Sequence, residues 1–370
     1  MIARIAINGF GRIGRNALRI ALEKSEVEVV AINDLAGARV LAHLLKYDSV
    51  YGTYPKEIQV EEDGKIVETE GLTTQSDHFT KTGYSESYLV VDGKRIKVLA
   101  EKDPSKLPWK ELNVDVVLEC TGRLTEGEAA SVHLKSGARK VIVSAPTKGE
   151  GVKTFLLGVN SDQYDGESVI SNASCTTNCI SPVASIISAK FGILKAAMTT
   201  IHAYTAEQNL IDGLPPALHE DLRRGRAAAF NIVPTTTGAA ISTAEVIPQL
   251  KGLFDGLAIR VPVIVGSLCD FTFLTKRKVT VDEVNQAFIK AKDNPFYKVV
   301  IDTSLEPLVS SDIIGSVYSA VVDLTLTKVI DGDLVKVVAW YDNEWGYSNR
   351  VVEMATLAAL GKRGMIPPSN

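Results

Sequence analysis

The stretch INGFGRIGR, residues 7–15, constrains the fold of this chain more than any other. Three glycines follow an apolar, strand-like run and precede apolar residues at helical spacing, namely Gly9, Gly11 and Gly14. This order of strand, glycine turn and helix opens a βαβ unit, and further apolar strands are predicted at 27–34, 114–122 and 140–146. Strands that alternate with helices predict a parallel sheet with right-handed crossovers.

One acidic residue, Asp34, stands at the end of the second predicted strand, 20 residues after Gly14. A carboxylate there can accept hydrogen bonds from both hydroxyls of an adenosine ribose, while the glycine turn and the helix N-terminus hold a pyrophosphate. The glycines could instead only pack the helix against the strand, but the complete βαβ context favours a dinucleotide. Because a carboxylate repels a 2′-phosphate, we expect NAD rather than NADP, although Arg39 follows a few residues later.

The pattern changes twice along the chain. Residues 56–98 are polar, with short alternating runs and Asp-Gly turns at 63 and 92, which predicts a peripheral antiparallel excursion. After Cys175 long alternating segments predict an antiparallel sheet, and the apolar spacing of residues 348–364 predicts a helix that returns to the first domain. We therefore expect an α/β protein with a Rossmann-type dinucleotide-binding domain (1–174 and 343–370) and an α+β catalytic domain with a mainly antiparallel sheet (175–342).

Composition excludes several classes of partner. The 370 residues include 40 Lys and Arg against 44 Asp and Glu, so no strong field attracts nucleic acid or an anionic membrane. The N-terminus does not resemble a secretory peptide, and the uncharged stretch from residue 168 to 189 contains Pro182 and many hydroxyl side chains. Four scattered cysteines indicate a reducing compartment, so we expect a cytoplasmic protein that binds small molecules and no metal.

The sequence SNASCTTNC, residues 171–179, places two cysteines one helical turn apart. Ser174 or Asn172 is a natural N-cap for the apolar helical pattern that follows, so Cys175 is expected in the first turn. The unpaired N–H groups and the helix dipole there favour a thiolate, whereas Cys179 lies one turn deeper. A reducing compartment weakens the hypothesis of a redox pair, and a zinc site would need a second pair of ligands that the chain lacks.

A nucleophilic thiol needs a proton acceptor, and His202 is the best placed of the five histidines. It lies at the end of a predicted strand 27 residues after Cys175, although a histidine in this position could also simply be buried. Beside a bound NAD, thiolate addition to an aldehyde gives a hemithioacetal that can lose hydride and become a thioester. The residues therefore predict an aldehyde-oxidising enzyme.

Taken together, these motifs resemble phosphorylating glyceraldehyde-3-phosphate dehydrogenases over nearly the whole chain. The resemblance is carried by INGFGRIGR, AINDL, HLLKYDSVYG, AEKDPSKLPW, SNASCTTNC, DLRRGRAAAFNIVPTTTGAA, RVPV and WYDNEWGYSNRV. It implies a homotetramer that oxidises glyceraldehyde 3-phosphate with NAD and inorganic phosphate in glycolysis and its reverse.

The resemblance also assigns roles to individual residues. It implies that Cys175 is the nucleophile and His202 the base. The implied NAD contacts are Arg12, Ile13, Asp34, Lys102, Ser144 and Asn343, in addition to the glycines of the turn. The implied site for the substrate phosphate consists of Thr205 and Arg260, and the implied site for inorganic phosphate consists of Ser174, Thr176, Arg224, Thr237 and Gly238, with Arg224 shared between the two. Arginine forks, hydroxyls and backbone donors are the groups that bind phosphate oxygens.

The chain departs from the family pattern in several places. The 56–98 excursion and the 206–222 loop are longer than usual, Glu207 stands where the family often has Asp, and Ile241 stands where many members have Lys. Two alternatives stay open at this point. One is an erythrose-4-phosphate dehydrogenase, in which water attacks the thioester, and the other is a non-catalytic NAD-binding scaffold.

Overall fold

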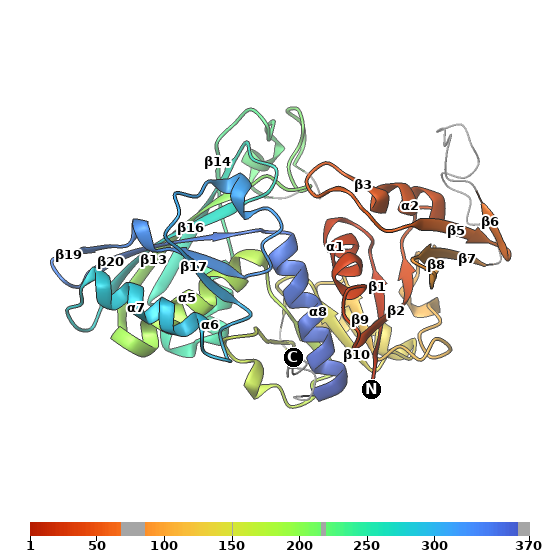
Figure 1. The fold of residues 1–370 in the computed structure, drawn as a ribbon, viewed down its shortest axis with the longest axis horizontal. Coiled ribbons are helices and arrows are strands. Elements are labelled where there is room, and N and C mark those ends of the chain that lie inside the picture. The colour runs from red at the N-terminus through yellow and green to blue at the C-terminus, as the bar shows by residue number, and fades with distance from the viewer. Residues whose placement is uncertain (68–85, 150, 216–219, 362–370) are drawn as a thin grey trace. The chain divides into compact units, whose positions relative to one another are not determined.

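A computed structural model describes residues 1–67, 86–149, 151–215 and 220–361, and the chain divides into two compact units. Unit 1 comprises Met1–Lys153, Asp165–Asn172 and Val351–Asn370, and unit 2 comprises Thr154–Tyr164 and Ala173–Arg350 (Figure 1). Residues 68–85 of the excursion and 216–219 of the longer loop lie outside the described residues. None of the described helices is both long and apolar enough to cross a membrane.

Unit 1 is built on a parallel sheet. Its strands run in the order β12-β10-β9-β1-β2-β8, with parallel pairing throughout this part of the sheet. Their bounds are β1 (Ala3–Asn8), β2 (Val27–Asn33), β8 (Lys94–Leu99), β9 (Val116–Glu119), β10 (Lys140–Val143) and β12 (Val169–Ser171), with β11 (Lys153–Thr154) at the edge. The connecting helices are α1 (Arg12–Ala21), α2 (Ala38–Lys46), α3 (Gly127–Ala130) and α4 (Val132–Lys135). The predicted Rossmann-type fold is confirmed.

The described part of the excursion extends this sheet beyond β8 with antiparallel strands, as predicted. These are β5 (Ile58–Glu62), β6 (Lys65–Val67) and β7 (Ser87–Val91), in the order β8-β7-β5-β6. Both Asp-Gly pairs have positive φ, as a tight turn between antiparallel strands requires. Helix α2 packs against β5 and β7, and a separate hairpin joins β3 (Tyr47–Asp48) to β4 (Gly52–Thr53).

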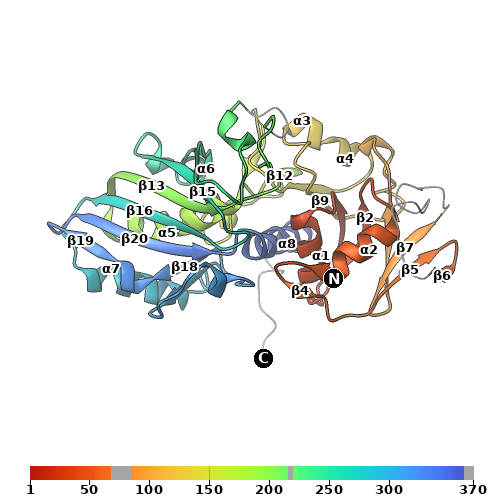
Figure 2. The same cartoon turned by 90° about the horizontal axis from the view of Figure 1, so that it is seen from above.

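Unit 2 contains the mainly antiparallel sheet that the sequence predicts. Its order is β14-β15-β13-β16-β20-β18-β17, with β19 paired to β20, and only β13–β15 and β17–β18 are parallel among these pairs (Figure 2). The bounds are β13 (Ile193–Ala203), β14 (Val233–Thr235), β15 (Phe254–Val261), β16 (Ser267–Thr275), β17 (Ile301–Ser304), β18 (Ala320–Asp323), β19 (Lys328–Ile330) and β20 (Leu334–Tyr341). Burial alternates along β16, because successive side chains point to opposite faces.

Helices cover one face of this sheet. α5 (Cys175–Phe191) contacts β13, β16, β18 and β20, and it packs against α6 (Ala239–Val246) and α7 (Val281–Lys292) (Figure 1). The hydroxyls of Ser181 and Thr243 join α5 to α6 at 3.0 Å. The closing helix α8 (Trp345–Leu360) belongs to unit 2 up to Arg350 and to unit 1 from Val351 onward. The N-terminus of α5 and the ends of β13, β15 and β20 supply the residues considered next.

Candidate active site

Cys175 is the first residue of α5, as predicted, and it is half-buried. Ser174 caps this helix, since its Oγ accepts the N–H of Thr177 at 3.1 Å. Such a cap stabilises a helix by about 1 kcal/mol and fixes where its first turn begins. The hydroxyl of Thr176 lies 4.0 Å from the sulfur of Cys175, and the N–H of Thr176 also bonds to it. The thiol is thus held at a helix end, where donors face it.

His202 lies next to this thiol. The distance between Sγ of Cys175 and Nε2 of His202 is 3.4 Å. On the other side of the ring, Nδ1 lies 2.6 Å from the carbonyl oxygen of Ala203, which can only accept, so Nδ1 carries the proton. Nε2 of the neutral ring is therefore left with a lone pair that faces the thiol. This geometry suits the transfer of the thiol proton to His202.

Burial acts on both members of this pair. Burial raises the pKa of the Cys175 thiol, and the charge of Arg260 and the bonds from Thr176 oppose this change. The pKa of His202 is lowered, first by burial and then by Arg260, against the bond to Ala203. The sequence argument considered only the helix end, so it missed that burial disfavours the thiolate. Moving the proton from sulfur to Nε2 creates two opposite charges in contact, so each charge stabilises the other.

A guanidinium and a hydroxyl stand beside this pair. Arg260 on β15 is the register partner of His202 on β13, and its Nη1 donates to Oγ1 of Thr205 at 3.0 Å. Burial lowers the pKa of Arg260, and the charge of Glu207 raises it. The Nε of Arg260 is buried and has no partner among the described residues. The structure therefore brings Thr205 and Arg260 together, as the sequence predicts, with one donor left for an anion.

The sequence analysis missed Tyr341, the last residue of β20. Its hydroxyl bonds to Oγ1 of Thr176 at 3.0 Å and to Oγ1 of Thr200 at 2.8 Å, and its ring stands edge-on to His202 at 5.9 Å between centroids. Tyr341 thus connects the first turn of α5 to the strand that carries His202. Its place two residues before Asn343 is the only signal in the sequence that could have indicated it.

Arg224, the residue expected to serve both anions, is almost entirely buried and engaged by the protein itself. Its Nη1 forms an ion pair with Glu207, its Nε donates to Oγ1 of Thr235 at 3.1 Å, and its Nη2 donates to the carbonyl of Thr236 at 3.2 Å. These contacts hold the guanidinium against the segment that leads to Thr237. The charge of Arg224 also lowers the pKa of His202, which indicates that the two side chains are near each other.

The other members of the expected inorganic-phosphate site lie at two helix ends. Gly238 is the N-cap of α6, and Oγ1 of Thr237 accepts the N–H of Ala239 at 3.2 Å. The hydroxyls of Ser174 and Thr176 bond to Thr177 and Tyr341, as described above. Among the described residues, no hydrogen bond joins these two groups, although α5 and α6 pack side by side. The structure thus places the two helix ends on neighbouring helices, with no hydrogen bond between these residues among those described.

Asn343 follows β20 and is buried. Its Oδ1 accepts the N–H of Gly266 at 3.2 Å and the hydroxyl of Ser267 at 2.9 Å. The same hydroxyl accepts the N–H of Ala203 at 3.1 Å, next to His202. Because these donors fix the amide oxygen, the amide Nδ2 of Asn343 has a defined direction in which to donate.

In unit 1 the glycine turn fits a pyrophosphate. A Cβ at Gly9, where φ is +95°, would lie 2.7 Å from the N of Thr121, and a Cβ at Gly14 would lie 2.1 Å from the carbonyl oxygen of Gly9. Both positions therefore exclude any side chain. Gly11, the N-cap of α1, has open space where a Cβ would stand and makes no side-chain cap bond. The first-turn N–H groups of α1 are the donors that such a cradle offers to an anion.

Asp34 lies beside this cradle, as predicted. Its Oδ2 accepts the N–H of Phe10 at 2.8 Å, and its Oδ1 accepts the N–H of Ala36 at 3.2 Å, so the carboxylate is fixed at the end of β2. Arg12 is tied to Asp48 at 2.5 Å, and this pairing with the neighbouring N–H groups lowers the pKa of Asp48 although burial raises it. Among the remaining expected NAD contacts, Ile13 and Ser144 are half-buried and Lys102 is exposed.

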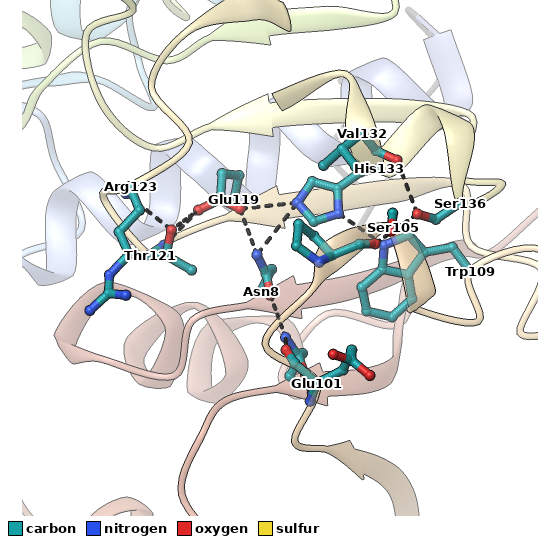
Figure 3. A network of polar contacts seen from close by, with 12 residues as sticks. Asn8, Glu101, Ser105, Trp109, Glu119, Thr121, Arg123, Val132, His133 and Ser136 are labelled. Carbon is teal, nitrogen blue, oxygen red and sulfur yellow. Dashed lines mark hydrogen bonds and ion pairs between the residues drawn. The ribbon is translucent and has the colours of Figure 1, made fainter. Parts of the chain in front are cut away.

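A buried polar network lies at the carboxyl ends of β1, β2 and β9 (Figure 3). Glu119 accepts from Nδ2 of Asn8 at 2.6 Å, from Nε2 of His133 at 3.0 Å, and from both the N–H and the hydroxyl of Thr121. Nδ1 of His133 lies 3.0 Å from Nε1 of Trp109, which can only donate, so Nε2 carries the ring proton. The sequence analysis did not anticipate this network.

Asn33 extends the network to the loop after β8. Its Nδ2 donates to Oδ1 of Asn8 at 2.7 Å and to the carbonyl of Glu101 at 3.0 Å, and its Oδ1 accepts the N–H of Glu101 at 2.9 Å. The network therefore connects the turns that hold Gly9, Asp34 and Lys102. This is the edge of a parallel sheet where ligands bind in open α/β folds.

The other three cysteines are Cys120, Cys179 and Cys269. Cys179 and Cys269 are fully buried, and burial raises the pKa of Cys120 to about 12 against a bond from Ser144. The four cysteines form no disulfide with one another. Within the described ranges, no cluster of three or more His, Cys, Asp or Glu side chains could hold a metal ion.

Comparison with known proteins identifies the family. Residues 3–81 and 73–127 match the family model for the glyceraldehyde 3-phosphate dehydrogenase NAD-binding domain, and residues 174–343 match the model for its C-terminal domain. The chain is 49% identical over 361 residues to glyceraldehyde-3-phosphate dehydrogenase of Geobacillus stearothermophilus, covering 97% of this chain and 99% of the relative. It is 48% identical over 357 residues to the Streptomyces coelicolor protein of the same name, covering 96% and 98%. With these matches over nearly its whole length, the chain belongs to the NAD-dependent glyceraldehyde-3-phosphate dehydrogenase family.

Proposed function

We propose that this protein oxidises glyceraldehyde 3-phosphate to 1,3-bisphosphoglycerate with NAD and inorganic phosphate, as a step of glycolysis and its reverse. The observation that carries the mechanism is the 3.4 Å contact between the sulfur of Cys175 and the unprotonated Nε2 of His202. Family membership supports the reaction class and the cofactor. The geometry of the site supports the roles proposed below for the individual residues.

In the first step Cys175 attacks the aldehyde carbon. Nε2 of His202 takes the thiol proton as the C–S bond forms and passes it to the carbonyl oxygen, which becomes the hydroxyl of a hemithioacetal and leaves Nε2 unprotonated for the next step. The donors at the start of α5 favour negative charge on sulfur before the attack, and they oppose the effect of burial. Tyr341 holds β13, which carries His202, next to the first turn of α5 through its bonds to Thr200 and Thr176.

In the second step the hemithioacetal is oxidised to a thioester. Bound NAD supplies the acceptor for the hydride that leaves the substrate carbon. His202 accepts the hydroxyl proton, so the carbonyl re-forms on the carbon that is now bonded to Cys175. Thr205 and Arg260 hold the phosphate of the substrate, and the unpartnered Nε of Arg260 suits a phosphate oxygen. This anchoring keeps the reacting carbon beside the sulfur.

In the third step inorganic phosphate attacks the thioester carbonyl, the C–S bond breaks, and Cys175 leaves as the thiolate. The donors proposed for this phosphate are Ser174, Thr176, Thr237, Gly238 and Arg224. The buried contacts of Arg224 with Thr235 and Thr236 support a fixed position for its guanidinium near the N-cap of α6. The incoming phosphate could replace Glu207 as the partner of Arg224, and it would then neutralise the charge of the guanidinium as Glu207 does.

NAD is held by unit 1 in this proposal. Gly9, Gly11 and the first turn of α1 at Arg12, Ile13 and Gly14 would hold the pyrophosphate, and Asp34 would accept from the adenosine ribose. Lys102 and Ser144 follow neighbouring strands of the same unit and would add further contacts to the dinucleotide. The ion pair of Arg12 with Asp48 supports a role for the backbone of Arg12 rather than for its side chain.

We further infer a homotetramer that acts in the cytoplasm. Six large apolar side chains of residues 210–232 are between 70 and 87% exposed, namely Leu210, Ile211, Leu214, Leu222, Phe230 and Ile232. An apolar group of this kind supports burial against another subunit. Sedimentation of wild type and Phe230→Asp tests the assembly, and a wild-type protein that sediments as a monomer would contradict it.

The reaction is tested by NADH formation from glyceraldehyde 3-phosphate with and without inorganic phosphate. We expect turnover that requires phosphate, loss of turnover in Cys175→Ser with NAD binding retained, and near-normal turnover in the control Cys179→Ala, whose buried sulfur lies one turn deeper. Turnover independent of phosphate would favour hydrolysis of the thioester, as in an erythrose-4-phosphate dehydrogenase. No turnover under any condition, with NAD binding intact, would favour a non-catalytic scaffold.

A further inference from the structure

The residues that follow β2 contain one cation that could change the choice of dinucleotide. Residues 33–39, NDLAGAR, include Asp34 and, five residues later, Arg39. The bond from the N–H of Ala36 to Asp34 folds this segment into a turn, and Gly37 caps α2, so Arg39 lies in the first turn of that helix. An arginine near the acidic residue is the group that accommodates the 2′-phosphate of NADP in this fold.

The structure shows where this guanidinium is held. Nη2 of Arg39 donates to Glu62 at 2.6 Å, and Nε lies 3.2 Å from each of the two carboxylate oxygens. The side chains are 15% and 5% exposed, so the pair is largely removed from water. Forked contacts of this kind are among the stronger charge-assisted hydrogen bonds. Breaking the pair is costly because the carboxylate would be left buried without its counter-charge.

Glu62 comes from the polar excursion of residues 56–98. It is the last residue of β5, in the described part of the 56–98 excursion, and β5 and β7 pack against α2. The excursion therefore contributes directly to the contacts of α2. It supplies a carboxylate to the helix that follows Asp34.

We propose that Glu62 determines specificity for NAD by holding the guanidinium of Arg39 away from the 2′ position of the adenosine ribose. Asp34 alone then faces this position, where it accepts from a hydroxyl and repels a phosphate. The inference rests on the proposed function only in that unit 1 binds NAD with its ribose at Asp34. In this proposal the Glu62–Arg39 ion pair determines how strongly the protein prefers NAD to NADP.

The test measures the Kd of NAD and of NADP by calorimetry on the full-length protein. In Glu62→Gln, which keeps the size of the side chain but removes its charge, we expect NADP to bind about tenfold more tightly, the worth of one charge-assisted hydrogen bond to phosphate. The Kd of NAD should stay unchanged. In the double variant Arg39→Gln/Glu62→Gln the gain for NADP should disappear, and this dependence on Arg39 is a readout that a merely structural role of Glu62 would not produce.

A matched control lies next to Glu62 on the same strand. Glu61 points to the opposite face of β5, where it forms a forked pair with Arg95 at 2.7 and 2.9 Å, and Glu61→Gln should leave both Kd values unchanged. The thermal midpoint of each variant reports whether it folds, and Glu62→Ala, which also removes the carboxylate and keeps Arg39, replaces Glu62→Gln with the same expected gain for NADP if that protein does not fold.

The outcomes separate this inference from the proposed function. An unchanged Kd of NADP in Glu62→Gln overturns the inference while NAD binding still stands. A gain for NADP that persists in the double variant shows that Arg39 is not the group released and also overturns it. If folded wild-type protein binds neither dinucleotide, the assignment of NAD to unit 1 is at fault.

Discussion

His202 presents an unprotonated Nε2 to the sulfur of Cys175 at 3.4 Å because its Nδ1–H is bound to the carbonyl of Ala203 at 2.6 Å. The tautomer is thus fixed by the strand that carries the ring. A base in this position can take the thiol proton and later the hydroxyl proton without moving.

Replacing this base tests its role. We expect His202→Asn to slow hydride transfer by about 10² to 10⁴, the usual worth of a positioned acid or base. Single-turnover formation of NADH measures this step directly. The Kd of NAD should not change, so a loss of cofactor binding would mean that the substitution disturbs more than the base. Full turnover across the pH range would remove His202 from this role.

The charge of Arg260 lowers the pKa of the Cys175 thiol against the effect of burial. Arg260→Gln should therefore raise that pKa, by roughly half to one unit, and leave less thiolate at neutral pH. Because the thiolate is the reacting form, alkylation by iodoacetamide should slow roughly three- to tenfold at neutral pH. The control Arg226→Gln removes an equal charge from an exposed pair with Asp212 and should leave the rate as it is. Faster alkylation in Arg260→Gln would contradict the direction of this effect.

The carboxylate at the end of β2 should decide how tightly NAD binds. In Asp34→Ala we expect the Kd of NAD to rise about tenfold and the discrimination against NADP to relax, since the acceptor of the ribose hydroxyls and the repulsive charge are both lost. Titration with each dinucleotide checks this, and Asp165→Ala, an exposed carboxylate elsewhere in unit 1, is the control. Unchanged constants would exclude Asp34 from the site.

The buried network at the strand ends should contribute to the stability of unit 1. His133→Phe keeps an aromatic ring but leaves the N–H of Trp109 without an acceptor and removes one of the two donors to Oε2 of Glu119, so we expect the free energy of unfolding to fall by about 1–3 kcal/mol. Urea denaturation followed by Trp fluorescence measures the loss. The same substitution at the exposed His43 should have little effect. Equal stability of His133→Phe and wild type would show that the network is replaceable by packing.

Local patterns in the sequence predicted several features that the structure confirms. The glycine turn lies between β1 and α1 because a Cβ at Gly9 or Gly14 would collide with neighbouring backbone. Ser174 caps α5 with Cys175 at its first position, and both Asp-Gly turns have positive φ. These features depend on residues close together in the chain, so their spacing was sufficient to predict them.

Contacts between distant segments were not predictable in the same way. The bonds of Tyr341 to Thr176 and Thr200, the pairing of Arg224 with Glu207 and the Glu119 network join residues that lie up to 165 positions apart. No period or spacing in the chain encodes such a contact, because it arises only when strands pair in one register. Burial of the thiol was missed for the same reason.

The sequence alone determined the types of the elements, the class of fold and the chemical groups available at each strand and helix end, because those depend on periodicity and on local backbone geometry. Only the tertiary structure decided which groups meet, which tautomer His202 adopts and which carboxylate holds Arg39. Those outcomes depend on the pairing of strands and on the removal of side chains from water, and both are properties of the folded chain as a whole.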